Sequence, residues 1–124
     1  MRNNPAPQMA NKASVASKAL LRAAELLGVS AKDLAQVVGV SEATLSRLKR
    51  GDTPKLAGKP YELALLFIRL YRSLDAIMGG DDEASRKWMR ARNVALGAEP
   101  LTRIKTVDGL THVLAYLDAR RAPV

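Results

Sequence analysis

Residues 30–51, which read SAKDLAQVVGVSEATLSRLKRG, decide the fold. Ser30 and Ser41 each begin a short segment with apolar residues at helical spacing, and a serine hydroxyl there can accept a hydrogen bond from the first helical turn. Gly39 separates the two segments, and glycine readily adopts the backbone conformation that a tight turn needs. Two short helices joined at Gly39 and Val40 form a helix-turn-helix. The stretch therefore predicts that the first half of the chain is a helix-turn-helix domain.

The second of these helices carries side chains suited to base edges in the major groove of DNA. Ala43 and Thr44 can contact thymine methyl groups, and Arg47 can reach O6 and N7 of guanine. Glu42 either accepts from cytosine N4 or only complements the helix dipole. Together with candidate phosphate contacts, the expected DNA-binding residues are Ser30, Lys32, Ser41, Glu42, Ala43, Thr44, Ser46, Arg47, Lys49 and Arg50.

The charge of the chain agrees with a polyanionic partner. The net charge is +8 in 124 residues, and phosphate backbones attract clustered lysine and arginine. Residues 1–56 hold nine basic and four acidic residues, whereas residues 57–124 hold eleven and eight. Positive charge is thus concentrated in the half of the chain that contains the proposed helix-turn-helix, as DNA binding requires. The alternatives are a helical hairpin with a solvated basic face and a protein-interaction adaptor with a degenerate helix-turn-helix.

The whole chain predicts an all-α fold, because no strand pattern competes anywhere. We expect a first helix from about Ala13, with Val15 on its inner face. The predicted organisation has four parts: a flexible arm at residues 1–12, a helix-turn-helix DNA-binding domain at 13–56, a long linking and dimerisation helix at 57–80, and a small helical module at 81–124.

The helix expected over residues 60–78 differs from the others because it is apolar on most of its circumference. Such a helix must be buried on two sides. In so small a protein we expect the second side to be covered by another subunit, which predicts a homodimer. The expected dimerisation residues are Leu63, Leu66, Phe67, Leu70, Leu74 and Ile77.

The residue types argue against catalysis. The chain has no cysteine, which removes disulfides, thiolate metal sites and cysteine nucleophiles. The single histidine, His112, has no catalytic partner nearby in the sequence, and the consecutive carboxylates at 81–83 suit helix capping better than chelation. We expect no enzyme activity, no cofactor and no metal. Without an apolar run of about 18 residues or a secretory signal, we expect a cytoplasmic protein that does not contact a membrane.

The second half of the chain carries a more specific pattern. Trp88, Asn93, Leu96-Gly97 and Pro100 follow the spacing Trp-x4-Asn-x2-Leu-Gly-x2-Pro, with Gly109 further on. Together with the helix-turn-helix, this pattern resembles the Xre/MbcA/ParS antitoxins of bacterial type II toxin–antitoxin systems. The family often has a proline before the asparagine and a second glycine after the first, where this chain has arginine and alanine.

The resemblance implies a dimer that binds its own operator and neutralises a toxin through its C-terminal region, often a RES-domain toxin that degrades NAD. The expected toxin-binding residues are Trp88, Asn93, Leu96, Gly97, Pro100, Arg120 and Arg121. Trp88 is either an interface anchor or a core residue that pins the following loop. The two arginines either contact the toxin or complement the negative end of the last helix. The alternative function is a plain helix-turn-helix repressor whose C-terminal half only dimerises or senses a ligand.

Overall fold

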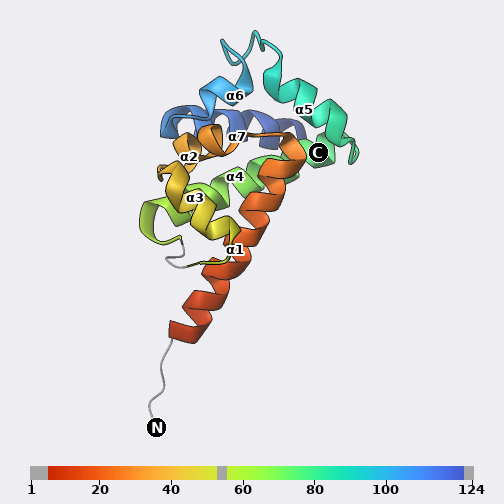
Figure 1. The fold of residues 1–124 in the computed structure, drawn as a ribbon. Helices are drawn as coiled ribbons and strands as arrows, with labels where there is room; N and C mark the ends of the chain where they lie inside the picture. The colour runs from red at the N-terminus through yellow and green to blue at the C-terminus, as the bar shows by residue number, and fades with distance from the viewer. Residues whose placement is uncertain (1–5, 53–55, 122–124) are drawn as a thin grey trace.

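The computed structural model describes residues 6–52 and 56–121. Over these ranges the chain forms helices and no strand, which confirms the all-α prediction. The helices (Figure 1) are α1 (Ala6–Leu27), α2 (Ala31–Val38), α3 (Glu42–Lys49), α4 (Gly58–Ile77), α5 (Asp82–Arg90), α6 (Pro100–Arg103) and α7 (Val107–Arg121).

The helix-turn-helix forms at α2 and α3 as the sequence predicts. The Ser30 hydroxyl accepts from the backbone N–H of Asp33 at 3.1 Å, and the Ser41 hydroxyl accepts from that of Thr44 at 3.0 Å. Gly39 ends α2 with a φ of 74°, in the left-handed region that favours glycine. Two caps and one glycine therefore fix the turn.

Helix α1 differs from its prediction at the N-terminal end. It begins at Ala6 rather than near Ala13, so residues 6–12 of the expected arm are helical, and the rest of the arm lies outside the described residues. A proline in the first helical turn does not interrupt the helix, because the first N–H groups have no intrahelical acceptor. Val15 does not face the core. Its side chain is 68% exposed, and Ala16 and Leu20 are buried instead.

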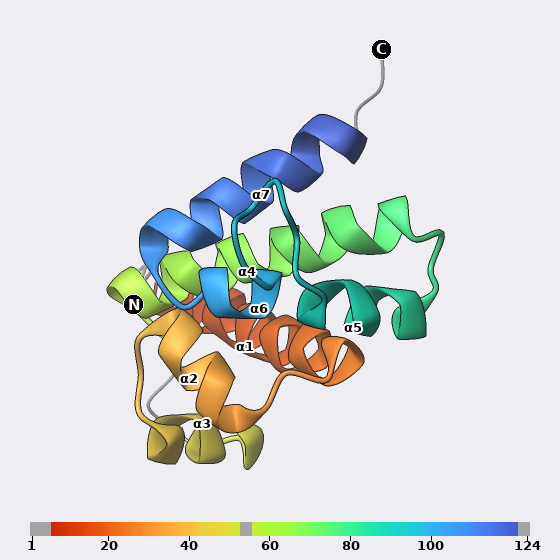
Figure 2. The ribbon, with the colours of Figure 1, turned by 90° about the horizontal axis from the view of Figure 1, so that it is seen from above.

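Helix α4 is covered on two sides by helices of its own chain. It lies between α1 and α7 (Figure 2) and packs most extensively against α7. Phe67, Leu70 and Leu74 are completely buried there, so these three residues leave no surface for a second subunit. The expectation that they form dimer contacts was wrong, because α7 returns along α4. Leu63 and Leu66 are half-buried, and Ile77 is exposed.

The two halves of the chain share one hydrophobic core. Its cluster of buried side chains runs from Leu20 in α1 through Leu45 in α3 to Met89 in α5 and Leu117 in α7. The C-terminal module is therefore packed onto the helix-turn-helix rather than linked to it loosely. In the described ranges, no helix is long and apolar enough to cross a membrane.

Candidate nucleic-acid interface and partner surface

Helix α3 exposes to solvent the side chains that are predicted to contact DNA bases. Leu45 and Leu48 are buried on its inner face, and at 100° per residue Ala43, Ser46 and Arg47 project from the opposite face. None of the ten residues expected to bind DNA is buried. Eight of them lie on α3 or at its caps, whereas Ser30 and Lys32 lie at the start of α2. Their contacts with DNA stay a prediction.

The Arg47 side chain is held in place on this face. Its guanidinium donates to the Thr44 hydroxyl at 3.2 Å, and that hydroxyl lies 3.0 Å from the Ser41 hydroxyl. At the far end of the helix, Arg50 pairs with Asp52 at 3.2 Å, although both side chains are more than half exposed. Arg47 is thus oriented by a neighbour on the outward face of α3, whereas Arg50 is paired with an acidic residue beyond the end of the helix.

The Asn-x2-Leu-Gly-x2-Pro pattern builds the loop between α5 and α6. The side-chain oxygen of Asn93 accepts from the N–H of Leu96 at 3.2 Å, and the backbone N–H of Asn93 donates to the carbonyl of Ala98 at 3.1 Å. Gly97 takes a φ of 76°, and Pro100 opens α6. Leu96 and Pro100 are buried, so direct toxin contact was a wrong expectation for these two. Their position is explained by folding of the loop.

The side chain of Trp88 joins an aromatic stack on the surface between α5 and α7. Its ring lies 6.4 Å from that of Tyr116, at an interplanar angle of 24°. The guanidinium of Arg120 lies 3.6 Å from the centroid of the Tyr116 ring. Both rings are half-buried, so Trp88 combines core packing with an accessible edge. Sequence reasoning missed Tyr116, although its position one helical turn before Arg120 is the signal that could have found it.

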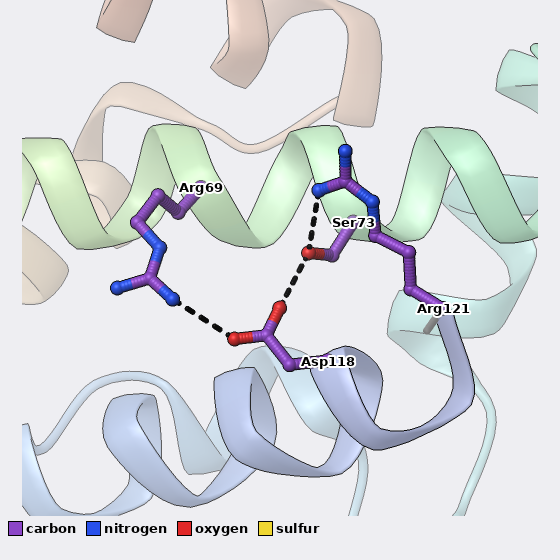
Figure 3. A network of polar contacts seen from close by, with 4 residues as sticks. All are labelled: Arg69, Ser73, Asp118 and Arg121. Carbon is purple, nitrogen blue, oxygen red and sulfur yellow. Dashed lines mark hydrogen bonds and ion pairs between the residues drawn. The ribbon is translucent and has the colours of Figure 1, made fainter. Parts of the chain in front are cut away.

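The end of α7 is tied to α4 through a polar network (Figure 3). Asp118 accepts from the Arg69 guanidinium at 2.9 Å and from the Ser73 hydroxyl at 2.7 Å, and Arg121 donates to the same hydroxyl at 3.3 Å. Ser73 is buried. Arg120 and Arg121 therefore both have partners within the chain, since Arg120 lies over Tyr116.

A second tie joins α5 to the end of α1. Arg86 donates to the carbonyl of Leu26 at 3.1 Å, and Arg90 donates to the carbonyls of Leu27 and Gly28. The last carbonyls of a helix have no intrahelical donor, and they form the negative end of its dipole. The two arginines of the C-terminal module therefore complete the first helix of the DNA-binding half.

We expect the double substitution Arg86→Ala and Arg90→Ala to lower the free energy of unfolding by about 1–2 kcal/mol, because hydrogen bonds from charged donors contribute more than neutral ones and exposure reduces the gain. Urea unfolding followed by circular dichroism measures this. Lys87→Ala is the control, since Lys87 lies on the same helix and pairs with the exposed Glu83 at 3.3 Å. Equal stability of the two variants would contradict a structural role for the tie.

The titratable residues outside the two surfaces are scattered among the helices. The described residues contain no group of three or more histidine, aspartate or glutamate residues that could hold a metal ion. Burial, followed by the charges of Asp75 and Asp82, raises the pKa of Tyr71 above its ordinary value, which keeps the phenol neutral. The nitrogen Nδ1 of His112 lies 2.8 Å from the Arg103 guanidinium, at an exposed site on α7.

Comparison with known protein families finds two matches. Residues 7–69 match the antitoxin Xre-like helix-turn-helix domain, and residues 73–122 match the antitoxin Xre/MbcA/ParS C-terminal toxin-binding domain. The two matches meet inside α4, which carries both parts. No individual curated protein matches the sequence.

Proposed function

We propose the function of this chain from one premise: it belongs to the family of antitoxins with an Xre-like helix-turn-helix domain, whose match covers more than half of it. With the toxin-binding domain that follows, it is an antitoxin of a toxin–antitoxin system that also binds DNA. We infer further that its toxin is a RES-domain protein that degrades NAD. We also infer that the antitoxin dimerises on its operator, represses its own transcription and is cytoplasmic, on the nucleoid when bound.

One observation carries the DNA-binding part. None of the ten predicted contact residues is buried, and eight of them lie on α3 or at its two caps, with Arg47 held on the outward face by Thr44. A dimer would place two such faces on one side of the duplex, one helical turn apart, which is the usual arrangement for helix-turn-helix repressors. Repression by a dimer is therefore the form of DNA binding that this fold suits best.

The toxin contact is proposed for the surface around Trp88, Tyr116 and Arg120, which we call the aromatic stack. Tryptophan, tyrosine and arginine are the residues most enriched among energetically dominant interface residues. The stack lies within the matched toxin-binding domain, and the exposed Val94 lies on the neighbouring loop. The assignment of a RES-domain toxin is supported by the family resemblance of the Trp-x4-Asn-x2-Leu-Gly-x2-Pro pattern.

The decisive experiment is co-expression of this chain with the product of the adjacent reading frame. We expect that product alone to stop growth and to lower cellular NAD, and the chain to restore both and to co-purify with it. Growth arrest without loss of NAD would remove the RES assignment and leave the antitoxin. Absence of toxicity and of a complex would favour the plain repressor, and the search would then turn to the operator.

We expect Arg120→Ala to weaken the toxin complex by about fivefold, or about 1 kcal/mol, because it removes the cation over the Tyr116 ring and a positive charge from the interface. Titration of labelled toxin measures the affinity. Thr111→Ala is the control, since Thr111 is exposed nine residues earlier, on the opposite side of α7. Unchanged affinity of the Arg120 variant would exclude the aromatic stack as part of the interface.

A further inference from the structure

An apolar groove between α1 and α4 is not used by either proposed interface. Val15, Ala19, Tyr61, Leu65 and Ile68 contribute to its walls, and its volume is about 550 Å³. Five large apolar side chains are exposed in the described part of the chain, and two of them, Val15 and Leu65, line this one groove. Exposed apolar residues that gather in one place mark an interaction site.

Figure 1 shows that the N-terminal part of α1 extends beyond the other helices, so one wall of the groove stands at the edge of the body. A short helical segment without neighbours is only marginally stable in water. Coverage of the groove by another chain would support this part of α1.

The exposed stripe of α4 beside the groove has a defined order of charges. Glu62, Leu65 and Arg69 are all exposed, and their spacings of three and four residues place them on one face of the helix. The single apolar residue of the stripe, Leu65, therefore has a negative charge before it and a positive charge after it. Within the chain Glu62 pairs with Lys59 at 3.5 Å and Arg69 with Asp118 at 2.9 Å, and the Glu62 and Arg69 side chains both stay more than half exposed. Such a stripe is complementary to itself when a second copy runs in the opposite direction.

We propose that a second copy of this chain covers the α1–α4 groove, with the two α4 helices antiparallel and the twofold axis at Leu65. In that arrangement Glu62 of each copy faces Arg69 of the other, because a twofold axis makes every contact reciprocal. Lys59 would approach Arg72 at the outer ends, but the Lys59 ammonium lies 3.5 Å from the Glu62 carboxylate of its own copy, which offsets its charge there. This inference rests on the proposed function, which requires a dimer. The groove takes the place of the buried Phe67, Leu70 and Leu74 as the expected contact surface.

Cysteine cross-linking tests the position of the axis, because the chain has no cysteine of its own. Leu65→Cys carries one thiol, which the proposal places next to its copy. We expect mild oxidation to convert most of this variant to a disulfide-linked dimer, whereas Val107→Cys, whose site is also exposed, stays largely monomeric on a denaturing gel.

Charge reversal tests the register. Glu62→Arg alone should weaken the dimer about tenfold in sedimentation equilibrium, since it then faces Arg69 of the other copy, and adding Arg69→Glu should restore it. Because Arg69 also pairs with Asp118 at 2.9 Å within the chain, circular dichroism of each variant checks that the fold is kept. The control is the same exchange at Arg22 and Glu25, an exposed pair three residues apart on α1, which should leave the dimer unchanged.

The outcomes separate this surface from the proposed function. A stable dimer that neither cross-links at Leu65 nor responds to charge reversal would overturn the groove proposal and leave dimeric repression intact. A monomer at micromolar concentration would overturn both the groove and the dimer, while toxin binding and DNA binding remain measurable separately. Loss of toxin co-purification in the Leu65 variant, with unchanged mass of the free antitoxin, would assign the groove to the toxin and also overturn the proposal.

Discussion

Replacement of Gly109 by alanine is expected to lower the free energy of unfolding by about 3 kcal/mol or more, since forcing atoms into a filled site strains the backbone. An added Cβ atom would overlap the carbonyl oxygen of Arg103 and lie 2.7 Å from its carbonyl carbon. Both are backbone atoms, so no side-chain rotation relieves the overlap. The turn between α6 and α7 would have to open, and with it the hydrogen bond from Gly109 N–H to the Thr106 hydroxyl.

Urea unfolding monitored at 222 nm would measure this effect. Thr111→Ala changes an exposed residue two positions further along the same helix and should stay within about 0.5 kcal/mol of the parent. Because the two halves share one core, we expect the Gly109 variant to lose operator binding as well as toxin binding near its lowered melting temperature. A Gly109 variant as stable as the Thr111 variant would mean that the α6–α7 turn is packed differently.

The parts of the fold that the sequence predicts correctly depend on short-range signals. A serine hydroxyl caps an N–H three residues away, and Gly39 forms its turn with its immediate neighbours. Such contacts can be predicted from spacing alone. The presence of Leu45 and Leu48 on the inner face of α3, and of Ala43 and Arg47 on the outer face, follows from helical periodicity in the same way.

The parts that the sequence does not predict depend on which helix returns to cover which face. The apolar circumference of α4 predicts burial on two sides, and the structure confirms it, but periodicity cannot distinguish α7 of the same chain from another subunit. Asp118 reaches Ser73 across 45 residues, and Arg90 reaches Gly28 across 62. Neither pair has a local pattern that a single sequence reveals.

The candidate toxin surface shows a related limit. The spacing of Trp88, Asn93 and Pro100 carries the family resemblance, yet Asn93 and Pro100 fold the loop. A pattern that identifies a family need not consist of contact residues, because a loop that presents an interface must itself be held in shape. Tyr116 and Arg120 add accessible surface beside Trp88, and they stand there only after α5 and α7 have both packed into the folded chain.

Arg47→Ala is expected to weaken binding to the operator by about 10- to 100-fold, or about 1–3 kcal/mol, with little change on unrelated DNA. A bidentate contact to guanine depends on a guanidinium that is already oriented, and the Thr44 hydroxyl holds Arg47 at 3.2 Å on the outward face of α3. Fluorescence anisotropy at one fixed salt concentration, on operator and scrambled duplexes, measures both affinities.

Lys49→Ala is the matched control on the same helix. Its side chain is exposed at the edge of the reading face, so its loss should weaken binding to both duplexes equally and reduce the salt dependence by about one counterion. If Arg47→Ala behaved like this control, Arg47 would be a phosphate contact. The bases would then have to be read by Ala43, Thr44 and Ser46, whose short side chains require α3 to lie deeper in the major groove.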